Sequence, residues 1–291
     1  MAFPPEAHWQ AAGLAVAAAA LFGAALVTTH SGLKYLDSAT GARVSIPTAT
    51  LLFWIVFPFT ELNGWHLAAA AIFGLVGLFF PAAVTLLTFE ANRRLGPTVT
   101  ATIGSTAPLF AVLGGALFLA EPLGGRALGA TALIVLGLVA LTRESGNAPV
   151  ARGRGGLWQA WSAAVLRALA QVLSKAGLAL WPSPYAAALL GYTVSSAAVW
   201  ASALRGGHVR AFNRTGAAWF ALTGGLNGAA VLALYCALNQ GPVSLVSPIA
   251  ATYPLFTLGL SALLLRNERL TGPLIAGVVL TVAGVAVLVL P

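Results

Sequence analysis

Long apolar stretches with almost no charged residues fill most of the sequence, and short segments between them hold most of the charges. Charged residues make up only 8% of the 291 residues, against roughly 25% in soluble domains. The stretches reach about 20 residues, the length at which a helix crosses the hydrocarbon core of a bilayer. A soluble domain of this size has no way to bury so much apolar surface. The sequence therefore predicts a multi-pass membrane protein built from helices.

Ten apolar stretches have the length of spanning helices, five on each side of the longest polar break, TRESGNAPVARGRGG. We therefore predict an all-α membrane protein with two five-helix repeats, residues 1–143 and 157–291, joined by a linker loop at 144–156. Because five is odd, the second repeat enters the membrane upside down, an inverted repeat that encloses a central cavity in many transporters. The predicted spans cover residues 9–30, 42–60, 66–90, 97–119, 124–142, 157–180, 184–204, 213–239, 242–265 and 271–290.

A repeated phrase supports the two copies. LGPTVTATIGSTAPLF at 95–110 returns as QGPVSLVSPIAATYPLF at 240–256. Downstream, AEPLGG at 120–125 returns as NERLTG at 267–272. An order kept over some fifty residues at a spacing of about 145 indicates an internal duplication.

Glycine and proline in the repeated phrase predict bent helices. Proline lacks a backbone N–H and is tolerated at the first helical position, so each Gly-Pro pair predicts a helix that starts after a flexible joint. Prolines inside a span free backbone carbonyls and bend the helix where it lines a cavity. The functional interpretation is a pair of moving elements, and the alternative is static packing. The candidate hinge residues are Gly96, Pro97, Pro108, Gly241, Pro242, Pro248 and Pro254.

The basic residues predict the orientation. Arg126 would be alone on one side, and Arg167 and Lys175 remain inside a span. By the positive-inside rule the basic side faces the cytoplasm, which places both termini outside a cell inner (plasma) membrane. The net charge of +8 is thus explained by topology, and we expect no nucleic-acid partner. The twelve basic residues on the other side, which complete the fifteen, are Lys34, Arg43, Arg93, Arg94, Arg143, Arg152, Arg154, Arg205, Arg210, Arg214, Arg266 and Arg269.

The predicted span 157–180 contains the sequence VLRALAQVLSKAG, with charged and polar residues near mid-membrane. Arg167 and Gln171 share one face, and Lys175 lies at its edge. Ionisable groups are costly inside a bilayer and usually functional. Since all seven carboxylates fall at or near span ends, we expect Arg167 to bind a carboxylate or phosphate of the substrate. The alternatives are that Arg167 binds helix carbonyls, Glu90 or Glu61, and that Lys175 extends to the interface.

Further substrate contacts are predicted from polar and aromatic residues in other spans. Asn227 and Tyr235 share one helical face in the predicted span 213–239. Tyr253, Tyr192 and Trp161 are candidates for an aromatic wall around the substrate. The alternative for each is helix packing or an interfacial position.

Ten spans in two inverted halves, Gly-Pro at the start of the fourth and ninth, and Glu-x-Leu after each, resemble the EamA branch of the drug/metabolite transporter superfamily. This resemblance implies export of small metabolites, such as neutral or aromatic amino acids, and distant similarity to carriers of sugar phosphates. Many members keep both termini in the cytoplasm, whereas the charges here place them outside.

We therefore predict a secondary-active exporter of small metabolites, most of all amino acids, that works by alternating access between the two repeats. A carrier of phosphorylated or dicarboxylic metabolites is the alternative, and a non-transporting receptor or scaffold is the alternative of another class. No HExxH, GxSxG or Walker motif occurs, so we expect no enzyme activity, cofactor or metal. A single chain with ten spans can enclose a cavity, so a monomer suffices.

Overall fold

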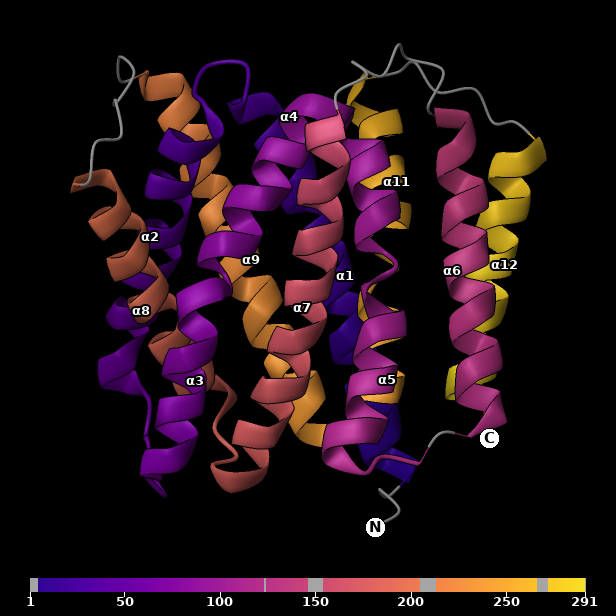
Figure 1. The fold of residues 1–291 in the computed structure, drawn as a ribbon, viewed down its shortest axis with the longest axis horizontal. Helices are drawn as coiled ribbons and strands as arrows, with labels where there is room; N and C mark the ends of the chain where they lie inside the picture. Colours follow the sequence, from indigo (N-terminus) through magenta and orange to yellow (C-terminus); the bar gives the residue numbers. More distant parts are fainter. Residues whose placement is uncertain (1–4, 123, 146–153, 205–212, 266–271, 291) are drawn as a thin grey trace.

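The computed structural model describes residues 5–122, 124–145, 154–204, 213–265 and 272–290, and within these ranges it contains helices and no strands (Figure 1). This agrees with the all-α expectation for the described part of the chain. The elements follow in the order α1 (Pro5–Gly32), α2 (Ser38–Val56), the 3-10 helix η1 (Phe57–Phe59), α3 (Leu67–Phe79), α4 (Ala82–Gly104), α5 (Ala107–Leu119), α6 (Gly125–Ser145), α7 (Arg154–Leu180), α8 (Pro184–Leu204), α9 (Arg214–Gln240), α10 (Val243–Ala250), α11 (Tyr253–Leu265) and α12 (Gly272–Val289).

Six helical segments in the described ranges are long and apolar enough to cross a membrane, and three shorter apolar helices accompany them. Large apolar side chains lie on the outside, among them Leu117, Phe118 and Leu263, which are 76–78% exposed. Such a surface is stable in contact with lipid and not with water. The structure is therefore that of a multi-pass membrane protein. The six segments are His8–Gly32, Ser38–Phe59, Leu67–Leu95, Gly156–Leu180, Arg214–Gln240 and Val243–Ser261.

Figure 1 defines two ends of the molecule. α1 begins and α12 ends at the lower end, and α4 carries the chain across the upper end before α5 returns downward. Polar caps fix several of the turns at the upper end. The Asp37 carboxylate accepts the N–H of Thr40 at the start of α2 (2.9 Å), and the Asn213 side chain accepts the N–H of Gly216 at the start of α9 (2.9 Å).

The repeated phrase contains two breaks with matching local structure. The first separates α4 from α5 at Thr106, and the second separates α10 from α11 at Thr252. The Thr106 hydroxyl donates to the carbonyl of Ile103 (2.7 Å), and the Thr252 hydroxyl donates to the carbonyl of Ile249 (2.8 Å). At both breaks the threonine therefore donates both its backbone N–H and its hydroxyl to the carbonyl three residues earlier.

The two Gly-Pro pairs lie in different local structures. Gly241 caps the end of α9, and Pro242 immediately precedes the first residue of α10, as the sequence predicts. Gly96 and Pro97 instead lie inside α4, so no new helix begins there. The carbonyl that loses its helical donor because of Pro97 belongs to Arg93, whose side chain is exposed at the upper end.

Of the three remaining prolines of the phrase, two directly follow a break between helices and one lies in the interior of a helix. Pro108 and Pro254 are each the second residue of a helix, α5 and α11. A missing N–H has no consequence there, because the first turn has no helical acceptors for it. Of the three, Pro248 alone lies beyond the first turn of its helix, α10. Motion at these positions remains a prediction.

The helices at the centre of the protein pack in two groups. Each group combines one helix from one half of the sequence with three helices from the other half. α1 packs mainly on α9, α10 and α11, and these four form what we name the α1 group. α7 packs mainly on α3, α4 and α5, which with it form the α7 group. The buried face of α1 is made of Ala11, Ala15, Ala18 and Ala25, and such small side chains let helices approach closely in a membrane. Each group therefore contains helices from both halves.

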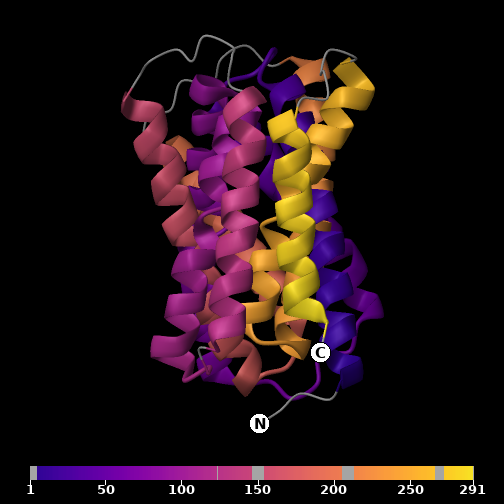
Figure 2. The ribbon, with the colours of Figure 1, turned by 90° about the vertical axis from the view of Figure 1, so that its right-hand side faces the viewer.

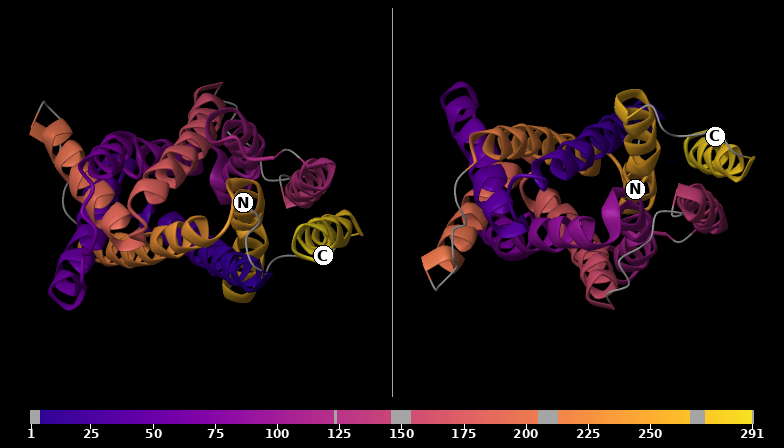
Figure 3. Two further views of the ribbon diagram at one scale, coloured as in Figure 1. Left: turned by 90° about the horizontal axis from the view of Figure 1, so that it is seen from below. Right: turned by 90° about the horizontal axis from the view of Figure 1, so that it is seen from above.

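Two further helix pairs flank these groups. α6 and α12 pack chiefly on each other and stand side by side at one edge (Figure 2). α2 and α8 lie at the opposite edge, as the views along the bundle show (Figure 3). The boundary between the α1 and α7 groups thus lies in the middle of the protein.

Candidate functional site

Arg167 lies in the middle of α7, with its guanidinium next to two aromatic rings. Its Cζ is 5.7 Å from the ring centroid of Phe22 on α1 and 5.7 Å from that of Tyr253 on α11. Both distances are within the roughly 6 Å at which a cation is attracted by a ring face. Because Arg167 belongs to the α7 group and both rings belong to the α1 group, the contact spans the boundary between the groups.

Two adjoining cavities, each about 40 Å³, open on Arg167. A volume of this size holds about one water molecule, whereas ligand pockets usually reach some hundreds of Å³. The site is therefore contracted in this structure, and a metabolite needs a rearrangement to fit. Residues shared by both cavities are Phe22, Thr88, Phe89, Arg167 and Asn227; Thr29, Thr100 and Tyr253 line one, and Phe80, Tyr192 and Val231 line the other.

The charge of Arg167 is not matched by a carboxylate of the described side chains. Glu90 accepts hydrogen bonds from Arg93, Arg94 and Ser38 at the upper end. Glu61 accepts one from Asn63. The Nε of Arg167 is buried and has no hydrogen-bond partner in the described part of the chain. The alternative that Arg167 binds Glu90 or Glu61 is therefore not what the structure shows.

The structure brings four of the predicted substrate residues together. Arg167, Asn227, Tyr253 and Tyr192 all line the central cavities. Tyr192 is 2% exposed, and among the described residues its hydroxyl has no hydrogen-bond partner. Gln171 is buried one turn further along α7, also with an unpartnered side-chain oxygen in the described part, but it does not line these cavities.

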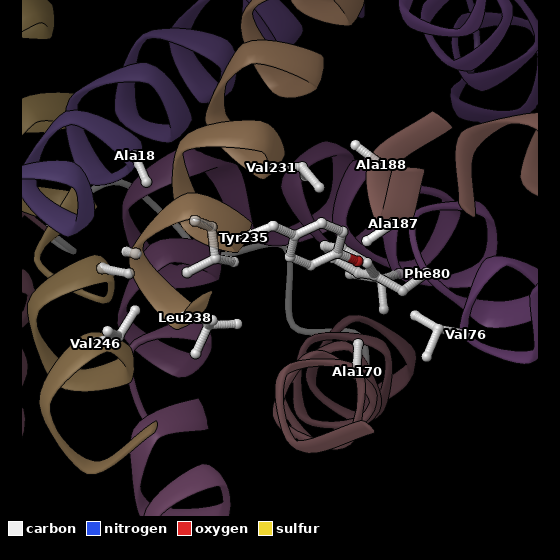
Figure 4. Packing of buried hydrophobic residues seen from close by; sticks show 14 of the residues in the cluster. Ala18, Val76, Phe80, Ala170, Ala187, Ala188, Val231, Tyr235, Leu238 and Val246 are labelled. Carbon is white, nitrogen blue, oxygen red and sulfur yellow. The ribbon is translucent and has the colours of Figure 1, made fainter. Parts of the chain in front are cut away.

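The structure places the other three candidates elsewhere. Lys175 donates from Nζ to the carbonyls of Leu238 (2.6 Å) and Gly241 (2.9 Å) at the end of α9. Tyr235 does not line these cavities and is packed in the apolar cluster that includes Phe80 and Leu238 (Figure 4). Trp161 is 45% exposed on the outside of α7. Its side chain faces away from the site because position 161 lies well around the helix from Arg167.

Sequence reasoning missed several cavity residues. Phe22 and Thr29 come from α1, and Thr88, Phe89 and Thr100 come from α4. Phe22 looks like any apolar residue of a span, and only the packing of α1 on α11 brings it near Arg167. Hydroxyl residues at helical spacing in an apolar span, such as Thr85 and Thr88, were the available signal.

Gly104 allows Tyr253 to reach this position. A Cβ at Gly104, the last residue of α4, would lie 2.1 Å from the Tyr253 hydroxyl oxygen. No side chain fits at that distance, so any larger residue displaces the tyrosine. The first break in the repeated phrase therefore packs directly against the residue that follows the second break.

Two larger cavities lie at the ends of the molecule. The upper one has about 730 Å³ and is lined by the α1–α2 connection together with residues of α4 and α7, including Lys34, Glu90 and Gln159. Its lining begins at Leu33, which directly follows α1 and lies about one helical turn above Thr29 of the central cavities. The lower one, about 530 Å³, lies between α1, α10 and the α6–α12 pair and does not include the Arg167 site.

The sequence matches the model of the EamA-like transporter family over two segments, residues 9–143 and 154–290. The chain belongs to this family. EamA-like proteins are transporters of the drug/metabolite transporter superfamily and not enzymes. The coarser expectations of a multi-pass membrane transporter are thereby confirmed.

A solved structure described as "Crystal structure of protein" shares the fold. It is 17% identical, the match covers 95% of each chain, and the TM-score is 0.73. At this identity the likeness concerns the fold alone. No curated protein matches the sequence.

Proposed function

We propose that this EamA-like transporter is a secondary-active exporter of small metabolites with one anionic group, most of all neutral or aromatic amino acids. The observation that carries the proposal is the guanidinium of Arg167 between Phe22 and Tyr253, at the boundary of two helix groups. A carboxylate brought by a substrate would give Arg167 the bidentate partner that the described carboxylates do not provide.

The surroundings of Arg167 favour an amphipathic substrate. Side-chain oxygens of Thr29, Thr88 and Asn227 line the cavities and can accept hydrogen bonds from an ammonium group. Aromatic rings line the same space and suit an apolar side chain. An amino acid carries all three chemical features.

The alternative substrates, phosphorylated or dicarboxylic metabolites, carry two negative charges and would be bound best by two cations of the protein. Lys175 is engaged with the carbonyls of α9, so Arg167 is the cation that lines the central cavities. One guanidinium matches one carboxylate more closely than it matches a dianion. This favours the amino acid class within transport, and family membership favours transport over a receptor or scaffold.

We further propose ten spans in two inverted repeats, 1–143 and 157–291, with the linker at 144–156. The two segments matched by the family model and the matching breaks at Thr106 and Thr252 support this arrangement. The basic residues then place the upper end in the cytoplasm and both termini outside. Fusing a reporter enzyme that is active only outside the cytoplasm to the C-terminus tests the orientation, and an inactive fusion contradicts it.

Alternating access would proceed by rocking the α1 group against the α7 group. The contracted central site lies on their boundary, and the 730 Å³ cavity lies one turn above it. The structure thus supports a state in which the path is wider toward the upper end. The sequence-based expectation was that one repeat moves against the other. Here each moving group would instead contain helices from both repeats.

Counterflow in proteoliposomes tests the function. Vesicles with purified protein are preloaded in turn with phenylalanine, threonine, a triose phosphate and a quaternary amine, and uptake of the labelled compound is measured. We expect exchange of the amino acids and none in protein-free vesicles. Exchange of the phosphate alone would move the protein to the alternative class, and exchange of the amine alone would overturn the anion site.

A further inference from the structure

Two charged side chains fix the joint between α9 and α10 at the lower end. Lys175 donates to the carbonyls of Leu238 and Gly241, at 2.6 and 2.9 Å. These carbonyls lie at the C-terminal end of α9, where the last four have no helical donor and the helix dipole is negative. A half-buried ammonium therefore satisfies acceptors that no backbone group of α9 can satisfy.

Glu121 bonds the other side of this joint, the start of α10. Its carboxylate accepts the N–H of Val243 (2.8 Å) and the N–H of Ser244 (3.1 Å), the first two residues of α10. Pro242 has no side chain able to cap the helix. The carboxylate thus satisfies two free donors at the positive end of the α10 dipole.

The local backbone holds Glu121 in this position. Ala120, which caps α5, has a left-handed conformation with φ of 51°. The following N–H, that of Glu121, bonds back to the carbonyl of Gly115 (3.2 Å). A Cβ at Gly115 would lie 3.1 Å from a carboxylate oxygen of Glu121, so a glycine leaves the carboxylate the room it uses.

All four hydrogen bonds cross between the helix groups. Lys175 and Glu121, which closely follows α5, lie in the α7 group. Their partners, at the end of α9 and at the start of α10, lie in the α1 group. If the groups separate at the lower end, these bonds must break. Bonds within one group would survive the same motion.

The path is closed at the level just above this joint. Tyr235, Leu238, Val246 and Phe80 belong to one packed apolar cluster that draws on both groups (Figure 4). All four side chains are at most 4% exposed. A wide cavity exists toward the upper end, whereas the lower 530 Å³ cavity lies beside α6 and α12 and not beneath Arg167.

We propose that Glu121 and Lys175 are positioning residues that together hold the lower end of the transport path closed, and that their bonds to α10 and α9 break when this end opens. The inference rests on the proposed alternating access. We call these four hydrogen bonds of Glu121 and Lys175 the latch. Glu121 follows the first copy of the repeated phrase, and α10, the helix that it bonds, belongs to the second copy.

Accessibility of a single cysteine tests the latch without any substrate. Ser174 lies on the Arg167 face of α7, about 10 Å toward the lower end, and is fully buried. The reporter is Ser174→Cys in a Cys236→Ser background, since Cys236 is the one native cysteine. A membrane-impermeant thiol reagent is applied from the lower side of oriented vesicles, and the labelling rate is measured.

With the latch intact we expect slow labelling. Glu121→Ala should raise the rate at least tenfold, because both bonds to α10 are lost, and Glu121→Gln should give an intermediate increase. The matched control is Glu90→Gln, which removes a carboxylate at the upper end and should leave the rate from the lower side unchanged. A folded Glu121→Ala protein that labels as slowly as its parent would overturn the proposal.

Two further variants keep the test decisive. If Glu121→Ala does not fold, Gly115→Ala displaces the carboxylate with a smaller change and should also speed labelling. Lys175→Met should speed labelling as well, since it frees the same joint from the other side. Faster labelling without counterflow of any compound would retain the latch and reject the proposed substrates, whereas counterflow with unchanged labelling would do the reverse.

Discussion

Arg167 and Lys175 lie two turns apart on one helix, and both carry a positive charge within a predicted span. Lys175 has its ammonium on two carbonyls that end α9. Arg167 has its guanidinium near two rings, with its Nε unpartnered among the described residues. α7 thus carries one cation that is hydrogen-bonded to the end of another helix and one whose Nε has no hydrogen-bond partner among the described residues.

The difference shows that a charge inside a membrane needs a partner before it can be assigned a role. Insertion scales place the cost of either cation at about 2.5–3.5 kcal/mol at the membrane centre. Bonds to the end of a helix compensate Lys175 in this conformation. Aromatic faces compensate Arg167 only in part, about 0.5–2 kcal/mol, so binding of an anion stabilises the site further.

Replacing Arg167 should give the largest loss of transport. Arg167→Ala removes the guanidinium, and charge-assisted hydrogen bonds contribute about 1.5–3 kcal/mol each, so we expect a ~10- to 100-fold fall in counterflow. Thermal stability in detergent should change little, because no hydrogen bond of the described residues depends on the side chain. Arg167→Lys, which keeps the charge and loses the fork, should be intermediate. Unchanged transport and substrate affinity in Arg167→Ala would remove Arg167 from the site.

Lys175→Met should reverse this pattern. Two carbonyls lose their donor, which should lower the free energy of unfolding by about 1–3 kcal/mol. Apparent substrate affinity at equilibrium should stay within a few-fold, because Lys175 does not line the central cavities. Lys175→Arg retains donors and should recover part of the stability. A loss of affinity as great as that of Arg167→Ala would show that both cations bind substrate.

Gly104→Ala offers a steric test of the ring beside Arg167. The new methyl overlaps the Tyr253 hydroxyl, so the ring must move and counterflow should fall several-fold. Tyr253→Phe removes the overlapping atom, and the double variant Gly104→Ala, Tyr253→Phe should transport better than Gly104→Ala alone. Additive losses in the double variant would mean that Gly104 acts through something other than Tyr253.

The sequence alone was sufficient for the membrane class, the helical structure of the described residues and part of the candidate site, because these depend on local patterns. The predicted spans 97–119 and 242–265 are instead broken, at Thr106 and at Thr252. Arg167, Asn227 and Tyr253, which line a central cavity, were chosen as candidates because a polar residue is unusual in an apolar span. The role of Lys175 in bonding α9 was not predictable, because it depends on which helix end lies next to α7. Phe22 required the exchange of α1 into the group of α9 to α11, a long-range packing that no spacing in the chain reports.

Gly96-Pro97 illustrates the same limit at a smaller scale. The pair matches Gly241-Pro242 in sequence, yet it lies within α4, whereas its counterpart separates α9 from α10. Local propensity permits both outcomes, since proline tolerates a first-turn position and also an interior position where the freed carbonyl finds another donor. Tertiary context decides between them.

Trp161 should give the smallest effect, and it sharpens the comparison along α7. Its ring is 45% exposed on the outer face of the helix that carries Arg167 on the inner face. Trp161→Phe keeps an apolar ring toward lipid, and substitutions at such exposed positions usually change stability by no more than about 0.5 kcal/mol. We expect less than a twofold change in counterflow. A larger loss of substrate affinity would mean that α7 rotates during transport and brings its outer face to the path, so the division between a binding face and a lipid face would hold only for this conformation.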